Sequence, residues 1–374
     1  MSTYVKLLGT STYFPGKKIK FSDINKYLGN LKNAPEKIQK WIDKTQPTMK
    51  EMIGVDYCHY AFDSDTRTFT DDCLSMSVKA AEMALEDAKL SPQDIDLIIY
   101  ASAYSHNMPP ISTLIQDRLG IKSCGELQIH ANCTSVYKAI KMAQLLLTSK
   151  EYKNALVVSS SIASSYFIPE FYNHEVVKKE DIFLRWYLCD GAGAFVLSAT
   201  DVQKNGLFLE NTYFESVGGG KESGMGNTYP YTCLNPLEIY KNGYHHIRQS
   251  YMSELSKNSV EENQKTIFFN YLVKMLKNNQ IDISLLKHFV VNMPSKAVRE
   301  TIMYECVNDL KIPIDKFYSS IDNVGYAGPP AGLISIDNLL KEYAVDLKDG
   351  DLIISFVMEV SKYMVGGFTL RFFE

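Results

Sequence analysis

The chain has 374 residues, which is enough for one large hydrophobic core or two fused ones. Hydrophobic residues make up 45% of the sequence and charged residues 22%, as in ordinary soluble globular proteins. A net charge of −4 gives no overall reason to bind nucleic acid or an anionic membrane. No apolar run approaches the ~20 residues that span a bilayer, so we expect no membrane span.

The cysteines indicate a reducing compartment. They are scattered without a CxxC pair, which favours neither a disulfide framework nor a zinc site. The N-terminal residues lack the apolar core of a signal peptide, and we therefore expect a cytoplasmic protein. The seven cysteines are Cys58, Cys73, Cys124, Cys133, Cys189, Cys233 and Cys306.

Short apolar runs alternate along the chain with amphipathic helical patterns. Continuous apolarity predicts strands that are covered on both faces, and hence an α/β fold. The predicted strands lie at 97–102, 155–159, 194–198, 288–292, 352–357 and 367–372. The predicted helices lie at about 74–89, 134–148, 268–279, 295–309 and 331–343.

The two halves of the sequence resemble each other in their order of elements. In each half a helix and a short acidic turn lead into a buried strand, and a pair of strands closes the half. This similarity predicts a duplicated α/β unit, with one half at 1–200 and the other at 201–374. Residues 211–265 are rich in Gly, Asn, Tyr and Ser, and we interpret them as an irregular insertion that shapes a pocket.

Cys133 stands where an apolar run ends and a helical pattern begins. The first amides of a helix and the positive end of its dipole favour thiolate over thiol, and the thiolate is the nucleophile. This placement predicts a reactive cysteine. The alternative is a buried structural cysteine, which most free cysteines are.

Other motifs are weaker. Gly191-Ala-Gly193 lacks the third glycine of a dinucleotide loop and precedes a strand-like run, so no nucleotide cofactor is predicted. The histidines show no metal-ligand spacing. Asn292 ends a predicted strand and Asn323 lies in a Gly/Pro-rich loop before a helix; each is a turn or cap residue or part of a site at the strand ends.

Taken in order along the chain, these segments resemble the β-ketoacyl-acyl-carrier-protein synthase III group of the thiolase superfamily. The resemblance implies a duplicated βαβαβαββ unit in a five-layer αβαβα sandwich, usually a homodimer. The resembling segments are 4–13, 41–43, 53–55, 96–102, 116–121, 131–133, 155–159, 190–194 and 323–330.

The resemblance also implies a reaction. In the family a cysteine takes an acyl group from coenzyme A or a carrier protein, and a histidine and an asparagine hold the thioester carbonyl of malonyl-carrier during decarboxylation. The match gives Cys133 the acylated position and Asn323 the asparagine position, whereas the histidine position falls on Asn292. An amide donates a hydrogen bond but carries no proton or positive charge, so condensation is weakened rather than excluded.

Two further departures and four secondary positions follow from the same match. Cys133 precedes Thr-Ser instead of small residues, and Glu359-Val-Ser-Lys-Tyr replaces much of a glycine-rich loop. For the four secondary positions, ordinary surface or core packing is the alternative. They are Met108 as a gate reaching across the dimer, Trp41 as an adenine-stacking residue, and Lys296 and Arg299 as contacts to phosphopantetheine or an acidic carrier.

We therefore expect an acyl-thioester transferase or condensing enzyme of a specialised lipid or polyketide pathway. It would use no cofactor, and coenzyme A or phosphopantetheine thioesters would be its substrates. One alternative is a non-decarboxylating acyltransferase whose acceptor is an amine or hydroxyl. The other is a non-catalytic partner subunit of a heteromeric synthase.

Overall fold

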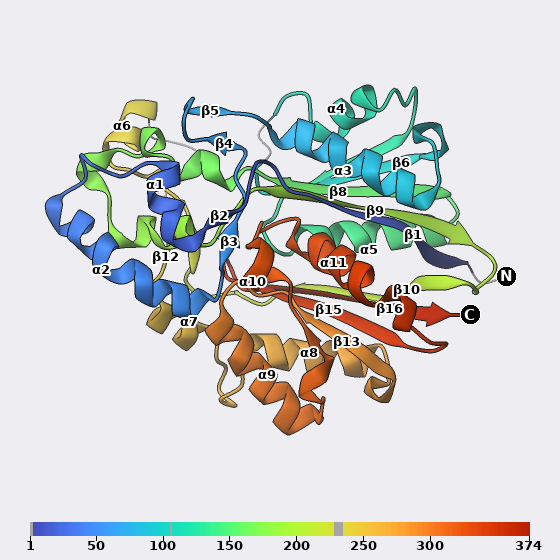
Figure 1. The fold of residues 1–374 in the computed structure, drawn as a ribbon. Helices are drawn as coiled ribbons and strands as arrows, with labels where there is room; N and C mark the ends of the chain where they lie inside the picture. The colour runs from blue at the N-terminus through green and yellow to red at the C-terminus, as the bar shows by residue number, and fades with distance from the viewer. Residues whose placement is uncertain (1–2, 105–106, 228–234) are drawn as a thin grey trace.

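A mixed sheet runs through the molecule (Figure 1). The computed structural model describes residues 3–104, 107–227 and 235–374, and in these residues the main sheet has ten strands. Their order is β14-β13-β15-β16-β10-β1-β9-β8-β6-β7. The strands of the first half are β1 (Tyr4–Tyr13), β6 (Leu97–Ala101), β7 (Gly125–Ile129), β8 (Asn154–Ser161) and β9 (Gly191–Thr200). Those of the second half are β10 (Gly206–Ser216), β13 (Leu286–Val291), β14 (Phe317–Tyr318), β15 (Leu352–Glu359) and β16 (Met364–Phe373).

The two halves have the same topology. In each, the first strand lies beside the fifth, then come the fourth, the second and the third. The third, second and fourth strands are parallel to one another, whereas the fifth strand is antiparallel to both the fourth and the first. The halves meet where β1 pairs antiparallel with β10 over Val5–Leu7. The duplication expected from the sequence is therefore present, while the boundary at residue 200 stays a prediction.

Helices divide the molecule into five layers (Figure 1). α5 (Ser135–Thr148) and α11 (Ala331–Tyr343) lie between the two half-sheets and contact strands of both. The outer face of the first half-sheet carries α3 (Cys73–Ala88) and α4 (Ile111–Arg118), and that of the second carries α8 (Ile267–Asn278) and α9 (Lys296–Leu310). The predicted five-layer α/β sandwich is confirmed.

Local sequence explains where the main helices start. The Asp72 carboxylate accepts the Ser75 N–H at 2.7 Å and so caps α3, and Thr266 Oγ1 accepts the Phe269 N–H at 3.1 Å at the start of α8. The central strands β6 and β8 are buried throughout, as their continuous apolarity predicts. Each predicted helix agrees with an observed one to within two residues.

The predicted irregular insertion is only partly irregular. Its first residues belong to β10, whose mixed burial hides the apolar run that marks a central strand. The remainder holds β11 (Met225–Gly226), α6 (Pro236–Lys241), β12 (Arg248–Gln249) and α7 (Met252–Asn258). It packs beside an N-terminal segment made of β2 (Ile19–Lys20), α1 (Ile24–Leu28), α2 (Glu36–Ile53), β3 (Tyr57–Cys58), β4 (Phe62–Asp63) and β5 (Thr68–Phe69). Among the described residues, no helix is long and apolar enough to cross a membrane.

Candidate active site

Cys133 lies between the end of β7 and the start of α5. It is half-buried, and it packs against both the core of the sandwich and the core formed by the N-terminal segment. The predicted strand-to-helix junction is therefore observed, and it places a thiol where the two cores meet.

A buried carboxylate occupies the helix N-terminus beside this thiol. Glu359, from the end of β15, accepts the Thr134 N–H at 2.9 Å and the Thr134 hydroxyl at 2.7 Å, and it also accepts the Asn132 N–H and the Ser361 hydroxyl. Burial raises the pKa of the Cys133 thiol to about 12, and the Glu359 carboxylate adds to the rise. The expectation that the helix end favours a thiolate is wrong, because Glu359 uses those amides and opposes a second negative charge.

The Tyr326 side chain reaches the same place from the second half. It is 1% exposed, and its hydroxyl forms no hydrogen bond of standard geometry with the described residues. Burial raises the Cys133 pKa, and the adjacent Tyr326 hydroxyl opposes that rise. The loop before it needs Gly325, which has φ of +80° and whose Cβ would approach the Cys189 sulfur to 2.9 Å. A backbone hydrogen bond of 3.1 Å from the Cys189 N–H to the Tyr326 carbonyl fixes the loop.

Asn292 is fully buried at the end of β13. Its backbone N–H donates to the Phe356 carbonyl at 3.0 Å, which fixes its position. Neither its side-chain oxygen nor its side-chain nitrogen has a hydrogen-bond partner of standard geometry among the described residues. Its amide lies near the Tyr137 hydroxyl, which bonds Ser355 at 2.9 Å. A buried amide without partners is costly, so this one is suited to a group that arrives from outside the protein.

The structure does not bring Asn323 to this site. Asn323 is exposed on α10 (Ile321–Val324), and its backbone N–H donates to the Ser320 carbonyl at 3.1 Å. Tyr326, three residues further along the same loop, is the side chain that lies beside Cys133. The loop predicted to contribute to the site therefore reaches Cys133 through Tyr326, and the catalytic role of Asn323 is without structural support.

Arg299 is a structural brace and not the surface contact that the sequence predicts. It is 5% exposed, donates to the Met293 carbonyl at 2.9 Å and the Pro294 carbonyl at 3.2 Å, and forms an ion pair with Asp322. These bonds join the turn after Asn292 to α10. A guanidinium with three internal partners is not available to a phosphate.

The other three secondary positions lie outside the catalytic cluster. Lys296 is exposed at the start of α9 and lies 3.9 Å from Glu300, so it remains available to a ligand. Met108 is 97% exposed. Trp41 packs against Phe183 and Trp186, and Lys179 lies 5.5 Å from its ring centroid. This packing leaves Trp41 partly exposed, and its role toward adenine stays a prediction.

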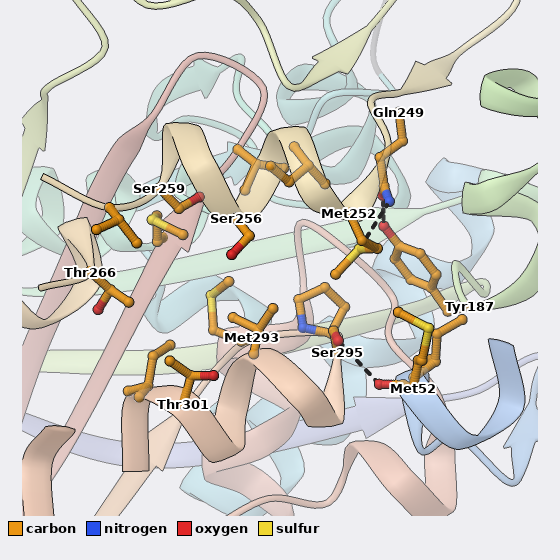
Figure 2. A pocket seen from close by; sticks show the side chains of 18 of the residues that line it. Met52, Tyr187, Gln249, Met252, Ser256, Ser259, Thr266, Met293, Ser295 and Thr301 are labelled. Carbon is orange, nitrogen blue, oxygen red and sulfur yellow. Dashed lines mark hydrogen bonds between the residues drawn. The ribbon is translucent and has the colours of Figure 1, made fainter. Parts of the chain in front are cut away.

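A cavity opens beside the cluster, between α2, α7 and α9 (Figure 2). Its volume is about 120 Å³. Met293, next to Asn292, and Met358, next to Glu359, line it. Tyr187 also lines it and belongs to the core cluster against which Cys133 packs. The cavity is therefore adjacent to the candidate catalytic residues.

The cluster holds one thiol and two neutral hydrogen-bond donors. A thiol can take an acyl group from a thioester, and amide and phenol donors can stabilise the negative charge that develops on the carbonyl oxygen. Among the described residues, no group of three or more His, Cys, Asp or Glu side chains is placed to hold a metal ion.

Sequence reasoning missed Tyr326, Tyr137 and the role of Glu359. Tyr326 stands between Gly325 and Ala327 in a Gly/Pro-rich loop. Turns are dominated by Gly, Pro, Asn, Asp and Ser, so a tyrosine at this position was a signal that the side chain is buried. Nothing local marks Glu359 or Tyr137, because their partners come from distant parts of the chain.

Comparison with known proteins agrees with this architecture. Residues 127–216, which include Cys133, match the family described as 3-Oxoacyl-[acyl-carrier-protein (ACP)] synthase III. The chain is 26% identical over 325 residues to the Beta-ketoacyl-[acyl-carrier-protein] synthase III of Clostridium perfringens, which covers 85% of this chain and 89% of the relative.

Solved structures share the fold across nearly the whole length. The structure described as "AbyA1 - tetronic acid condensing enzyme" has a TM-score of 0.78 at 18% identity and covers 98% of this chain and 99% of its own. The 3-oxoacyl-(acyl carrier protein) synthase III of Pseudomonas aeruginosa has a TM-score of 0.74 at 17% identity, with 99% of each chain covered. The chain is therefore similar in sequence to the 3-oxoacyl-acyl-carrier-protein synthases III and shares the fold of their solved structures.

Proposed function

We propose that the protein is an acyl-thioester transferase in which Cys133 accepts an acyl group from a coenzyme A or phosphopantetheine thioester. The Cys133 sulfur attacks the thioester carbonyl, the bond from that carbonyl to the donor sulfur breaks, and the acyl group remains on Cys133. The Cys133 proton leaves on the departing thiol, so no oxidant, reductant or cofactor takes part.

The observation that carries this proposal is the pairing of a thiol with two buried donors that have no standard hydrogen-bond partner. The Asn292 amide and the Tyr326 hydroxyl both lie in the cluster around Cys133. Buried donors of this kind are unfavourable in an empty site and become favourable when a carbonyl oxygen arrives. They would orient the thioester and stabilise the oxyanion.

The raised pKa of Cys133 fits a transfer between thiols. Because burial raises the pKa of Cys133 to about 12, the resting thiol is a poor nucleophile toward solutes. A bound thioester supplies a leaving sulfur that can take the proton as the new bond forms. Reaction is thereby confined to molecules that occupy the site.

For the second half of the reaction, we propose an acceptor that needs no decarboxylation, such as an amine or hydroxyl. Decarboxylation of a malonyl group forms an enolate, whose stabilisation draws on strong donors. Asn292 is neutral, and the side chain from the Ser320–Pro330 loop that lies beside Cys133 is the tyrosine Tyr326 and not an asparagine. Rapid release of labelled carbon dioxide from malonyl-carrier by the acylated protein would contradict this part and favour condensation.

A single-turnover measurement tests the first half. The protein is mixed with an acyl-coenzyme A, and release of free coenzyme A is followed with a thiol-reactive chromophore. We expect one equivalent per chain from the wild type and none from Cys133→Ala. No release with coenzyme A or carrier donors of any chain length would favour the non-catalytic partner subunit.

We also propose a homodimer formed through β7. This strand is at the edge of the sheet and pairs only with β6 in the part of the chain that the structure describes. An edge strand offers free backbone groups to a second copy. Light scattering is expected to give twice the chain mass; a monomer at micromolar concentration would contradict the proposal. The cytoplasmic location likewise remains a prediction.

A further inference from the structure

The Tyr137 side chain carries a hydroxyl from the central layer into the core of the second half. Tyr137 lies on α5, four residues after Cys133, and is fully buried. Its hydroxyl forms a hydrogen bond of 2.9 Å with the Ser355 hydroxyl on β15. This bond therefore links the helix that begins beside Cys133 to the strand that ends at Glu359.

Two glycines of the second half leave the space that the Tyr137 ring occupies. A Cβ at Gly366 of β16 would lie 2.7 Å from the Tyr137 Cβ, and one at Gly332 of α11 would lie 3.1 Å from Tyr137 Cε2. The ring also packs against Phe368, with the two ring centroids 5.4 Å apart. A ring enclosed in this way by backbone and by a second ring holds its hydroxyl in one place.

The polar surroundings of this hydroxyl include Ser355 and the Asn292 amide. Both residues are fully buried, and neither polar atom of the Asn292 side chain has a hydrogen-bond partner of standard geometry among the described residues. Burial raises the pKa of the Tyr137 phenol, and Ser355 and then Asn292 oppose that rise, so all three groups lie within interaction distance. A phenol buried in this way keeps its proton near neutral pH and can serve as a donor.

The three groups have one hydroxyl hydrogen to spare. The Tyr137 and Ser355 hydroxyls carry one hydrogen each, and the bond between them uses one of the two. Asn292 Oδ1 is a buried acceptor beside Tyr137 without a standard partner within the residues that the structure describes. A hydroxyl that donates to Oδ1 fixes the orientation of the amide and leaves both Nδ2 hydrogens for a group that arrives from outside the protein.

We propose that Tyr137 is a positioning residue that orients the Asn292 amide toward the thioester. Ser355 donates to the Tyr137 oxygen, Tyr137 donates to Asn292 Oδ1, and the Asn292 N–H is presented to the thioester carbonyl. This inference rests on the proposed acyl transfer at Cys133. A free amide can present either its oxygen or its nitrogen, and only the N–H stabilises an oxyanion. Tyr137 removes the unproductive orientation before the substrate arrives.

A double-mutant cycle separates this role from a structural one. Acylation of Cys133 by an acyl-coenzyme A is timed by rapid quenching and intact mass in the wild type, Tyr137→Phe, Asn292→Leu and the double variant. Tyr100→Phe is the matched control. The Tyr100 hydroxyl also bonds a buried serine, Ser160, at 2.9 Å, but it lies in the core that packs against α3 and α4.

Tyr137→Phe should slow acylation about tenfold when Asn292 is present, which is a coupling of the size found between residues in contact. It should have no further effect once Asn292 is replaced by leucine. Tyr100→Phe should leave the rate unchanged. Equal slowing by Tyr137→Phe with and without Asn292 would show that Tyr137 acts independently of the amide and would overturn the inference.

Alkylation by iodoacetamide separates positioning from access to the thiol. This reaction forms no oxyanion, so Cys133 should be alkylated as fast in Tyr137→Phe as in the wild type. A matching loss in acylation and alkylation would show that the variant displaces Cys133 and would overturn the inference. If the wild type accepts no acyl group, the proposed function fails and this inference fails with it. Wild-type acylation that Tyr137→Phe leaves unchanged overturns the inference alone.

Discussion

The Tyr326 hydroxyl lies beside the Cys133 thiol, although the two residues belong to different halves of the chain. Each is near the end of a loop that enters a helix of the central layer, Cys133 before α5 and Tyr326 before α11. The duplicated topology therefore brings two equivalent loops together, and the candidate site forms where they meet.

Replacing Tyr326 by Phe tests whether this hydroxyl acts on the thioester. Removal of one donor from an oxyanion site costs about 10²–10³ in rate, and we expect Tyr326→Phe to slow acylation of Cys133 by that factor. The melting temperature should not fall, because the hydroxyl has no hydrogen bond of standard geometry to lose within the described residues. An unchanged acylation rate would remove Tyr326 from the mechanism.

Asn292→Leu separates stability from function. A leucine of similar size removes two buried polar atoms without standard partners, so the free energy of unfolding should rise by about 1–2 kcal/mol while acylation slows at least tenfold. Asn154→Leu is the matched control, because its buried amide donates to the Asp94 carbonyl at 2.8 Å and accepts the Ser198 hydroxyl at 2.7 Å. That variant should be destabilised. Urea denaturation measures both, and a loss of stability in Asn292→Leu would contradict the assignment.

Glu359→Gln should make Cys133 more reactive. In the wild type, burial and the Glu359 carboxylate raise the Cys133 pKa to about 12, so the rate of alkylation by iodoacetamide should rise tenfold per pH unit from 7 to 10 without a plateau. Removing the negative charge lowers the Cys133 pKa, and each unit of that decrease raises the thiolate fraction about tenfold in this range. Peptide mapping assigns the modified thiol. A slower reaction in the variant would show that Glu359 serves Cys133 in another way.

Arg299→Met tests the brace between the Asn292 turn and α10. Loss of its bonds to Met293, Pro294 and Asp322 should lower the free energy of unfolding by about 2–4 kcal/mol. Lys296→Met is the control on the same helix, because Lys296 is exposed and its contact to Glu300 is long, and it should change stability by less than about 0.5 kcal/mol. Equal effects of the two variants would contradict the brace.

Most of the fold could be predicted from the sequence, because the burial of each element follows its local pattern of apolar residues. Continuous apolar runs identified central strands such as β6 and β8, and the 3.6-residue period identified the five long helices that were predicted. β10 was missed because its exposed and buried residues mix without a regular alternation. Its place is determined by pairing with β1 and β16, which lie at the two ends of the chain.

The site was less predictable, for reasons of geometry. Cys133 could be identified from its position at a strand-to-helix junction. Whether Asn323 or Tyr326 faces Cys133 depends on how the loop turns between them. That turn depends on the positive φ of Gly325. The pKa of Cys133 was predicted in the wrong direction because burial, and after it the Glu359 carboxylate from the other half of the chain, raise it. A local dipole argument has no access to such a partner.

The central claim is that Cys133 is the acyl acceptor, and intact mass tests it most directly. The protein is exposed to acyl-coenzyme A and acyl-carrier thioesters of increasing chain length, and its mass is compared with that of Cys133→Ala under the same conditions. We predict a gain of one acyl group in the wild type, mapped to the peptide that contains Cys133, and no gain in the variant. An acyl adduct that persists in Cys133→Ala, or the lack of any adduct with every donor, would contradict the account.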